Sequence, residues 1–361
     1  MSDDAFQPLR PAVHGYAMEW DAEHDRYRLV AVDRGKVLVT GTLDECQNEL
    51  IVALEKDWGT GHPNLAIPTP GGLQFWADVF WFAGWRIQEN VYTGHCRLLD
   101  SSNVRRAWGS REACRATFER LRTAEDLAVE NEHLVVLLHG LGRTRESLSH
   151  MKRELRNAGY MTASITYPST RRSLHEHADQ LAGVFNRLEG ISTVSFVTHS
   201  LGGMVVRLAL AQGAEWKSRI DVGRLVMLAP PSHGSALAEG IEDFMPAQLV
   251  LGPSAGGLAT DEVRSIPPPG CSFGIIAAGG PDDDGWNPLI SGNNDGIVAV
   301  EETRLEGAED FYLVRGLHTF FMNDPNVIRA TVRFLKTGRF LEGAAETPED
   351  DSLPTAPDEV E

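Results

Sequence analysis

One short stretch of the sequence combines a reactive hydroxyl with a backbone setting that could activate it. Residues 194–198 are mostly β-branched or aromatic and predict a buried strand, and apolar residues recur at helical spacing from Met204 onward. The run HSLGG (residues 199–203) lies between them. In a strand–turn–helix setting, the pattern G-x-S-x-G lifts a serine hydroxyl to the top of a strained turn. Ser200 is therefore the candidate nucleophile, with Thr198 in place of the first glycine. The alternative is an ordinary strand-to-helix turn with an incidental serine.

A serine nucleophile needs a base to take its proton and an acid to orient that base. Asp295, in the turn-rich loop SGNNDG, and His318, between the last predicted strand and the last predicted helix, follow Ser200 in the order Ser, acid, His. Both are expected at the carboxyl ends of parallel strands, where open α/β sheets hold their sites. The rival residues are His233 for the base and, for the acid, Asp282, Asp283, Asp284, Glu239 and Glu242.

Backbone N–H groups are the expected donors to the oxyanion that forms during acyl transfer. The N–H of Leu201, directly after the candidate nucleophile, is the first candidate. The second is the N–H of Leu141, in the loop HGLG (residues 139–142) that follows a strong strand pattern. The side chains of His139 and His199 are expected to brace these loops rather than to react.

The elements that must position these groups alternate between strand and helix. The continuous apolar run 134–138 is typical of a parallel strand that is covered on both faces. The predicted strands are 134–138, 160–166, 194–198, 224–228, 273–278 and 311–314, and the predicted helices are 146–157, 174–188, the segment after Ser200, and 325–335. This alternation predicts an α/β fold with a doubly wound, mostly parallel sheet.

Five segments resemble the α/β-hydrolase superfamily: LVVLLHGLGR, VTHSLGG, APPSHGS, NNDGIV and GLHTFF. Within it they are most similar to small bacterial triacylglycerol lipases, serine esterases and GPI-inositol-deacylase-like proteins. The resemblance covers residues 132–341 and implies Ser200 as nucleophile, Asp295 as acid, His318 as base, and the N–H groups of Leu141 and Leu201 as oxyanion donors.

The implied activity is hydrolysis of a small-molecule or lipid carboxylic ester through an acyl-enzyme. One alternative is acyl transfer to an alcohol by the same residues. Another is a binding or scaffold protein that acts through the N-terminal domain. Fold analogy alone does not name the substrate.

Residues 1–125 carry no such motif and are expected to form a small α+β domain of unknown role. The starts of two predicted helices in this region match: Gly41-Thr42 and Gly109-Ser110 precede them, and Cys46 and Cys114 lie one turn inside them. This similarity favours a duplicated ββα unit. Chance similarity of two short helix starts is the alternative.

Six of the eight tryptophans fall in this first region, several of them in LQFWADVFWFAGW (residues 73–85). As a helix, this stretch is apolar nearly all round and should be buried. We expect it to serve core or interdomain packing. An aromatic wall beside a ligand, or a docking face for the second domain, is the alternative. We expect no catalytic group here, because no nucleophile–base pattern is present.

Composition narrows the remaining possibilities. The net charge of −18 argues against binding to nucleic acid through a basic face, and no stretch approaches the ~20 apolar residues of a membrane span. The start of the chain has no secretory signal pattern, and the four cysteines lack metal-site spacing, which favours reduced thiols in a cytoplasmic protein. We expect no cofactor and no metal, and the sequence identifies no protein partner.

Two further segments flank or interrupt the predicted hydrolase domain, residues 126–341. Residues 232–270 are expected to form a short cap or lid, or alternatively a helix that covers the sheet edge. Residues 342–361 are acidic and proline-containing, which predicts a disordered tail.

Overall fold

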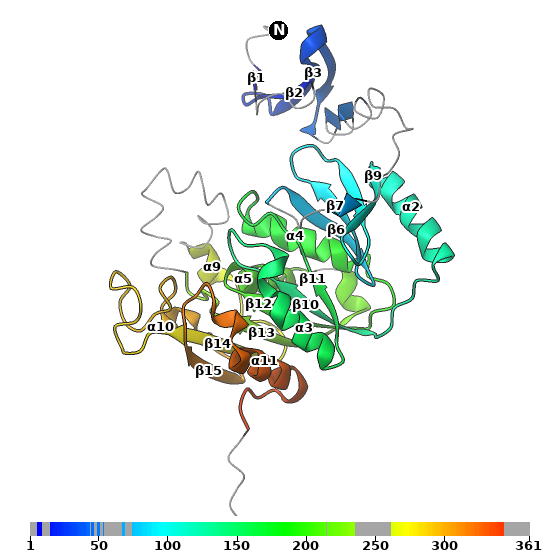
Figure 1. Ribbon diagram of the computed structural model, residues 1–361. Helices are drawn as coiled ribbons and strands as arrows, with labels where there is room; N and C mark the ends of the chain where they lie inside the picture. The colour runs from blue at the N-terminus through cyan, green and yellow to red at the C-terminus, as the bar shows by residue number, and fades with distance from the viewer. Residues whose placement is uncertain are drawn as a thin grey trace, which may run out of the picture.

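The computed structural model describes residues 6–8, 15–43, 45–46, 49–50, 53, 67–68, 74–213, 215–234 and 261–342. Three β-sheets make up this part of the chain: one parallel and two antiparallel (Figure 1). Much of the helix predicted after residue 44, most of the predicted cap and nearly all of the predicted acidic tail lie outside the described residues.

The parallel sheet has six described strands in the order β11-β10-β12-β13-β14-β15, and every neighbouring pair is parallel. The strands are β10 (His133–Leu138), β11 (Met161–Ser164), β12 (Thr193–His199), β13 (Asp221–Leu228), β14 (Phe273–Gly279) and β15 (Asp310–Arg315). The predicted doubly wound α/β fold is confirmed. The chain reverses its direction of travel across the sheet between β10 and β12, so their carboxyl ends form the switch point at which such sheets hold sites.

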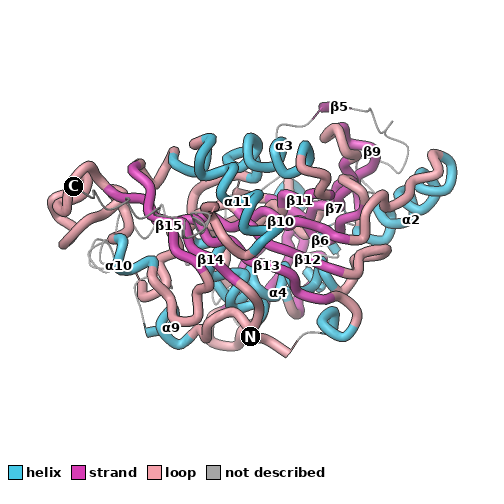
Figure 2. Tube along the Cα trace, turned by 90° about the horizontal axis from the view of Figure 1, so that it is seen from below, coloured by secondary structure: helices cyan, strands magenta, loops and turns pink. Residues whose placement is uncertain are grey.

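Side chains of one strand pack against two different helix layers, because successive residues point to opposite faces. In β10, Val135 and Leu137 face the layer formed by α3 (Ser149–Asn157) and α11 (Pro325–Thr337). Leu134 and Val136 instead pack with residues of the helices α4 (Leu174–Phe185) and α5 (Leu201–Ala211). Figure 2 shows α3 and α11 on one side of the sheet and α4 on the other. Burial on both faces explains the uninterrupted apolar run in the sequence.

The main helices begin and end at residues suited to those positions. Ser173 and Glu176 form a capping box at the start of α4, and Asp324 caps α11 ahead of Pro325. The shorter helices are η3 (Arg145–Leu148), η4 (Glu215–Ser218), α9 (Asp261–Ser265), α10 (Val300–Thr303) and η5 (Phe321–Asn323). In the described part of the chain, no helix has the length and apolar character to cross a membrane.

The first region contains two separate antiparallel sheets. One runs in the order β1-β2-β3-β4: β1 (Gln7–Pro8), β2 (Tyr16–Asp21), β3 (Arg26–Ala31) and, after η2 (Val32–Arg34), β4 (Lys36–Gly41). The other runs in the order β5-β9-β8-β7-β6: β5 (Ile67–Pro68), β6 (Trp76–Phe82), β7 (Trp85–Asn90), β8 (Cys96–Leu99) and β9 (Val104–Gly109), followed by α2 (Arg111–Ala124).

Both sheets lead into a capped helix start. Glu45 accepts hydrogen bonds from Thr42, and Ser110 accepts one from the N–H of Ala113. Cys46 and Cys114 are both fully buried. These parallels are consistent with a duplicated unit, which stays a prediction.

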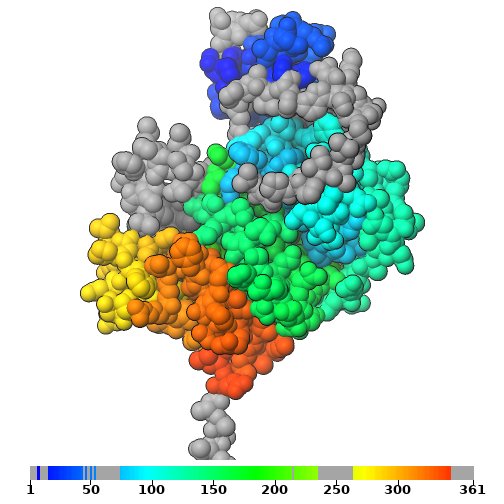
Figure 3. Space-filling view, viewed as in Figure 1, coloured from blue at the N-terminus to red at the C-terminus, as the bar shows by residue number. Residues whose placement is uncertain are grey.

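The tryptophan-rich stretch contains the strand β6 and ends at the first residue of β7, so its interpretation as a helix was wrong. Phe80 and Phe82 pack against Phe118 of α2, whereas Trp81 joins the core of the parallel sheet. The strand is therefore buried on both faces, which removes the polar–apolar alternation that identifies most antiparallel strands. Core and interdomain packing is confirmed as the role of these rings. In Figure 3, the cyan surface of residues 74–125, here called the β6–α2 unit, lies directly against the green surface that follows it in sequence.

Candidate active site

Ser200 occupies a strained turn between β12 and α5. Its φ of 52° and ψ of −123° are uncommon for a residue with a side chain, and such a conformation costs on the order of 1–3 kcal/mol. The Ser200 N–H donates to the carbonyl of Leu228 at 2.9 Å, and the Ser200 carbonyl accepts from the N–H of Gly203 at 2.9 Å. These bonds hold the turn, with the serine side chain at the start of the helix.

Two glycines allow the turn to pack closely against the carboxyl end of β10. A Cβ atom on Gly202 would lie 2.7 Å from the carbonyl oxygen of Leu138, and a Cβ atom on Gly140 would lie 2.9 Å from Nδ1 of His199. The same Cβ atom on Gly140 would lie 3.2 Å from the Cβ atom of Ser200, so Gly140 is next to the candidate nucleophile. Thr198 stands where a glycine is more usual, and its hydroxyl donates to the Val226 carbonyl at 3.4 Å.

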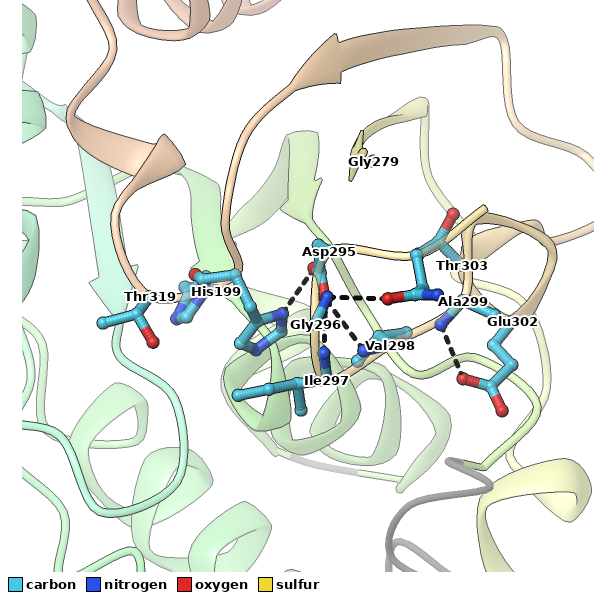
Figure 4. Close-up of polar contacts among 12 residues, drawn as sticks. His199, Gly279, Asp295, Gly296, Ile297, Val298, Ala299, Glu302, Thr303 and Thr319 are labelled. Carbon is cyan, nitrogen blue, oxygen red and sulfur yellow. Dashed lines mark hydrogen bonds and ion pairs between the residues drawn. The ribbon is translucent and has the colours of Figure 1, made fainter. Parts of the chain in front are cut away.

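The structure brings Asp295 and His318 together. Nδ1 of His318 lies 2.6 Å from Oδ2 of Asp295, and the His318 N–H donates to the Asp295 carbonyl at 2.9 Å. Oδ1 of Asp295 accepts hydrogen bonds from the N–H groups of Ile297 at 3.0 Å and Val298 at 2.8 Å (Figure 4). Only 1% of Asp295 is exposed, so these donors replace water as partners of the carboxylate.

His199 links this pair to the serine turn. Its Nε2 donates to the His318 carbonyl at 3.0 Å, and the two rings lie 4.7 Å apart. Since His199 directly precedes Ser200, the His318 ring lies beside the turn. Burial holds the pKa of His199 well below its ordinary value, so the ring is neutral and adds no positive charge next to His318. The expected bracing role of His199 is confirmed.

The hydroxyl of Ser200 makes no hydrogen bond to any described residue, and Ser200 is 8% exposed. A contact between nucleophile and base is often long in an unliganded site and tightens only in the complex with substrate. The pair Asp295–His318 is thus assembled next to the strand that carries the Ser200 turn.

The loop after β10, residues 139–144, is here called the oxyanion loop. The Gly142 N–H donates to Oγ of Ser169 at 3.0 Å, and the Arg143 N–H donates to the Gly140 carbonyl at 3.2 Å. The Leu141 N–H donates to no group in the described part of the chain. The Leu201 N–H opens α5, where the first amides have no partner within the helix.

His139 braces the base of the oxyanion loop, as expected. Its ring stacks on Tyr167 with centroids 4.3 Å apart, and its Nδ1 donates to the Gly140 carbonyl at 2.9 Å. The Tyr167 hydroxyl donates to the His139 carbonyl. Burial lowers the pKa of His139 to about 4, so this histidine is neutral near pH 7.

The rival residues do not join this arrangement. His233 is exposed, and its carbonyl accepts a hydrogen bond from Arg264. Asp282, Asp283 and Asp284 are exposed as well. Glu239 and Glu242 lie outside the described residues.

Sequence reasoning missed Asn294, whose buried side chain holds the loop that carries Asp295. Its Oδ1 accepts from the N–H groups of Trp286, Asn287 and Gly296. Its Nδ2, which carries two hydrogens, lies within hydrogen-bonding distance of the carbonyls of Asp284, Asn287, Ile290 and Gly292. The available signal was the dense run of turn-forming residues, in which asparagine side chains commonly bond nearby backbone.

Exposed apolar side chains lie near His318 and on the Asp295 loop. Leu317 and Phe320, on either side of the histidine in sequence, are exposed, as are Ile297 and Trp286. Side-chain atoms of Leu317 and Trp286 lie 3.7 and 3.8 Å from the position that a Cβ on Gly296 would take, so both residues lie next to Gly296 in the Asp295 loop. Searched over the described residues, the chain has no cluster of three His, Cys, Asp or Glu side chains that could hold a metal ion.

Residues 135–352 match the alpha/beta hydrolase family. No curated protein matches the sequence. Among solved structures, the fold is similar to a Bacillus licheniformis lipase, BlEst2, in its mature form, with 18% identity, a TM-score of 0.48, and coverage of 58% of this chain and 95% of that one.

Two other similar structures are a metagenomic carboxyl esterase, MGS0156, and the phospholipase PlaB from Legionella pneumophila. The esterase has 19% identity and a TM-score of 0.38, with 53% of this chain and 66% of that one covered. The phospholipase has 18% identity and a TM-score of 0.37, with 48% and 45% covered. At these identities the likeness concerns the fold.

Proposed function

The chain belongs to the alpha/beta hydrolase family, and on this premise we propose that it is a serine hydrolase that cleaves carboxylic esters. In this proposal Ser200 is the nucleophile, His318 the base and Asp295 the acid, with the N–H groups of Leu141 and Leu201 as oxyanion donors. The observation that carries it is the 2.6 Å contact of Asp295 with His318, held beside the strained Ser200 turn by His199.

The first half-reaction acylates the enzyme. Oγ of Ser200 attacks the ester carbonyl carbon while Nε2 of His318 takes the hydroxyl proton, which leaves a negative charge on the former carbonyl oxygen. The N–H groups of Leu141 and Leu201 donate to that oxyanion. The intermediate then collapses, His318 returns the proton to the leaving alkoxide, and an alcohol departs. Asp295 stays ionised and stabilises the imidazolium that forms in between.

The second half-reaction releases the acid. His318 takes a proton from a water molecule, whose oxygen attacks the acyl carbon, and the same two N–H groups accommodate the second oxyanion. Collapse of this intermediate breaks the bond to Ser200, and His318 protonates the serine oxygen. The enzyme is regenerated, and one ester and one water have become one acid and one alcohol.

The exposed residues Leu317, Phe320, Ile297 and Trp286 support an ester with an apolar acyl or alcohol part. Apolar substrate surface is stabilised there by about 25 cal/mol per Å² removed from water. The chain length that the enzyme prefers follows from assays on p-nitrophenyl esters of increasing acyl length.

The same panel tests the proposed function. Wild type should hydrolyse at least one ester, and Ser200→Ala should lower kcat by about 10⁶-fold, because the nucleophile is lost. Ser192→Ala, which removes an exposed serine hydroxyl from the loop before β12, is the matched control and should keep wild-type kcat. Turnover that survives in Ser200→Ala, or a wild type that cleaves no ester, contradicts the proposal.

Two alternatives give different results in the same system. An acyltransferase would form ester products when a competing alcohol is added, whereas a hydrolase releases mainly acid. A scaffold protein would show no Ser200-dependent turnover on any ester. The cytoplasmic location expected from the sequence is also a proposal, which cell fractionation tests.

A further inference from the structure

A single glutamine of the β6–α2 unit bridges two loops at the candidate site. Nε2 of Gln74 donates to the carbonyl of Arg143 at 2.6 Å. Its Oε1 accepts from the N–H of Thr170 at 2.9 Å, from Oγ of Ser169 at 3.1 Å and from Oγ1 of Thr170 at 3.2 Å. The side chain therefore uses both ends of its amide at once, with each end on a different loop of the hydrolase region.

Through these contacts, Gln74 acts on the part of the oxyanion loop that follows Leu141 in sequence. Arg143 belongs to that loop, and Ser169 accepts the hydrogen bond from the Gly142 N–H at 3.0 Å. Gln74 thus fixes the residue after Gly142 directly and Gly142 itself through Ser169. The orientation of the Leu141 peptide, whose N–H is the proposed oxyanion donor, depends on where those two neighbours are held.

Arg143 also connects this contact to the proposed base. Its guanidinium donates to the carbonyl of Thr319 at 2.9 Å, one residue beyond His318. The carbonyl of Arg143 is held by Gln74 and its side chain by the His318 loop. The two loops that flank the serine turn are therefore tied together through one residue, and that residue is anchored to the N-terminal region.

The anchor is rigid because the strand that follows Gln74 is locked to the parallel-sheet region. The N–H of Asp78 donates to the Thr166 carbonyl at 2.9 Å, and the N–H of Thr166 donates to Oδ2 of Asp78 at 2.7 Å. Nε2 of Gln180 donates to the carbonyls of Asp78 and Thr166, both at 3.0 Å. Asp78 and Thr166 are almost completely buried, so water does not compete for these bonds.

We propose that Gln74 is a positioning residue for the oxyanion loop, so that the β6–α2 unit sets the rate of a reaction in which it supplies no reacting group. The proposal rests on the proposed function, because it assigns Gln74 an indirect effect on the stability of the transition state of that reaction. A donor must lie within a narrow distance of the oxyanion, and a misplacement of about 1 Å costs up to about 100-fold in rate.

The test uses the full chain and two substitutions. Gln74→Leu keeps most of the side-chain volume and removes every hydrogen bond of the amide. Gln74→Glu keeps an acceptor for Thr170 and replaces the donor to Arg143 by a carboxylate oxygen that repels its carbonyl. Glu189→Gln is the matched control, since Glu189 pairs with Arg115 at 2.8 Å and Arg122 at 2.6 Å across the same interface, away from the loop.

Three quantities separate positioning from general support of the fold. They are kcat per serine titrated with a fluorophosphonate, KM for the best ester of the panel, and the inhibition constant of a trifluoromethyl ketone, whose adduct carries an oxyanion. We expect both Gln74 variants to lower kcat by about 10- to 100-fold with KM within twofold, and to weaken the ketone by the same factor as kcat/KM. Glu189→Gln should leave all three near wild type.

Each other outcome has a defined meaning. If Gln74→Leu and Gln74→Glu titrate and turn over within twofold of wild type, whatever their thermal stability, Gln74 has no positioning role. If KM rises while kcat holds, Gln74 serves substrate binding and the proposal is overturned. If wild type carries no adduct on Ser200, the proposed function fails and this inference with it. Should Gln74→Leu not fold, Gln74→Glu alone decides, because it retains the acceptor contacts.

Discussion

The parallel-sheet region and the β6–α2 unit differ in where their strands end. In the parallel sheet, neighbouring strands end at one edge, so residues from β10, β12, β14 and β15 loops converge there. In the antiparallel unit, successive strands end at opposite edges, and its buried rings around Phe118 serve packing. Topology thus explains why every candidate reacting group lies in one region.

The contact between the two regions adds a second lesson. The β6–α2 unit holds no nucleophile–base pair, yet Gln74 and Asp78 bind the segments that shape the oxyanion loop. A region can therefore influence a reaction by fixing the backbone of another region. The comparison predicts that substitutions of the candidate reacting groups in the parallel-sheet region abolish the chemistry, whereas substitutions in the β6–α2 unit weaken the support of the oxyanion loop.

Asp295→Asn is the substitution in this comparison with the largest expected effect. The substitution keeps the shape of the side chain but removes the charge that orients and stabilises His318, so kcat should fall by about 10⁴-fold with little change in KM. Steady-state kinetics on the best ester measure it. Asp283→Asn, in an exposed loop, is the control and should leave kcat and KM unchanged. A loss below about tenfold for Asp295→Asn would remove this residue from the proposed triad.

The next largest expected effect is on the free energy of unfolding, through the contact between the β6–α2 unit and the parallel-sheet region. Asp78→Ala removes the acceptor for the Thr166 N–H and for Nε2 of Gln88 at 2.7 Å, and the buried Arg86 loses the carboxylate 3.6 Å from its Nε. A buried charge left without its partner costs on the order of 3–5 kcal/mol. Urea unfolding followed by tryptophan fluorescence should show a loss of that size.

The matched control for Asp78→Ala is Asp283→Ala, which should change the free energy of unfolding by less than about 0.5 kcal/mol. Equal effects of the two substitutions would mean that the interface contributes little. Independent unfolding of the β6–α2 unit in wild type would also mean that the interface contributes little to stability.

The smallest effect is a pH dependence carried by the oxyanion loop. Burial lowers the pKa of His139 to about 4, whereas an unfolded histidine titrates near ~6.5. Between these values the unfolded chain binds the extra proton, so stability is full above ~6.5 and falls as the pH drops toward 4. The loss is at most about 1.4 kcal/mol per pH unit for this residue.

Urea unfolding of wild type and His139→Asn between pH 7 and pH 4.5 measures this dependence. The stability of the variant should fall less steeply, by about 1.4 kcal/mol per pH unit at the steepest point. Repeating the series at high salt separates the effect from surface charge, which salt screens. Identical slopes for the two proteins would show that His139 accepts a proton as readily in the folded protein as in the unfolded chain.

The parallel sheet was predictable because its signals are local. Runs such as 134–138 are apolar and bounded by turns. Ser200 directly follows β12, His318 comes shortly after β15, and Asp295 lies in the long loop after β14. β6 was misread because it is buried on both faces by two different regions, which makes its sequence look like a fully apolar helix. Periodicity reports how many faces are buried and does not report what covers them.

Gln74 and Asn294 were beyond sequence reasoning for a different reason. A glutamine or asparagine side chain has no motif, and its value depends on partners that folding brings to it. Gln74 bonds residues 69 and 96 positions away. Asn294 stands in a turn-rich run that predicts a loop and gives no sign that one amide holds that loop together.

The central claim is that the Ser200 hydroxyl forms a covalent acyl bond during turnover. Incubation of the wild-type protein with a fluorophosphonate, followed by mass spectrometry of its peptides, tests this most directly. The account predicts one adduct, on the peptide that contains Ser200, which forms more slowly in Asp295→Asn and is absent in Ser200→Ala. An unmodified Ser200 peptide in wild type, or an adduct on a different residue, would contradict it.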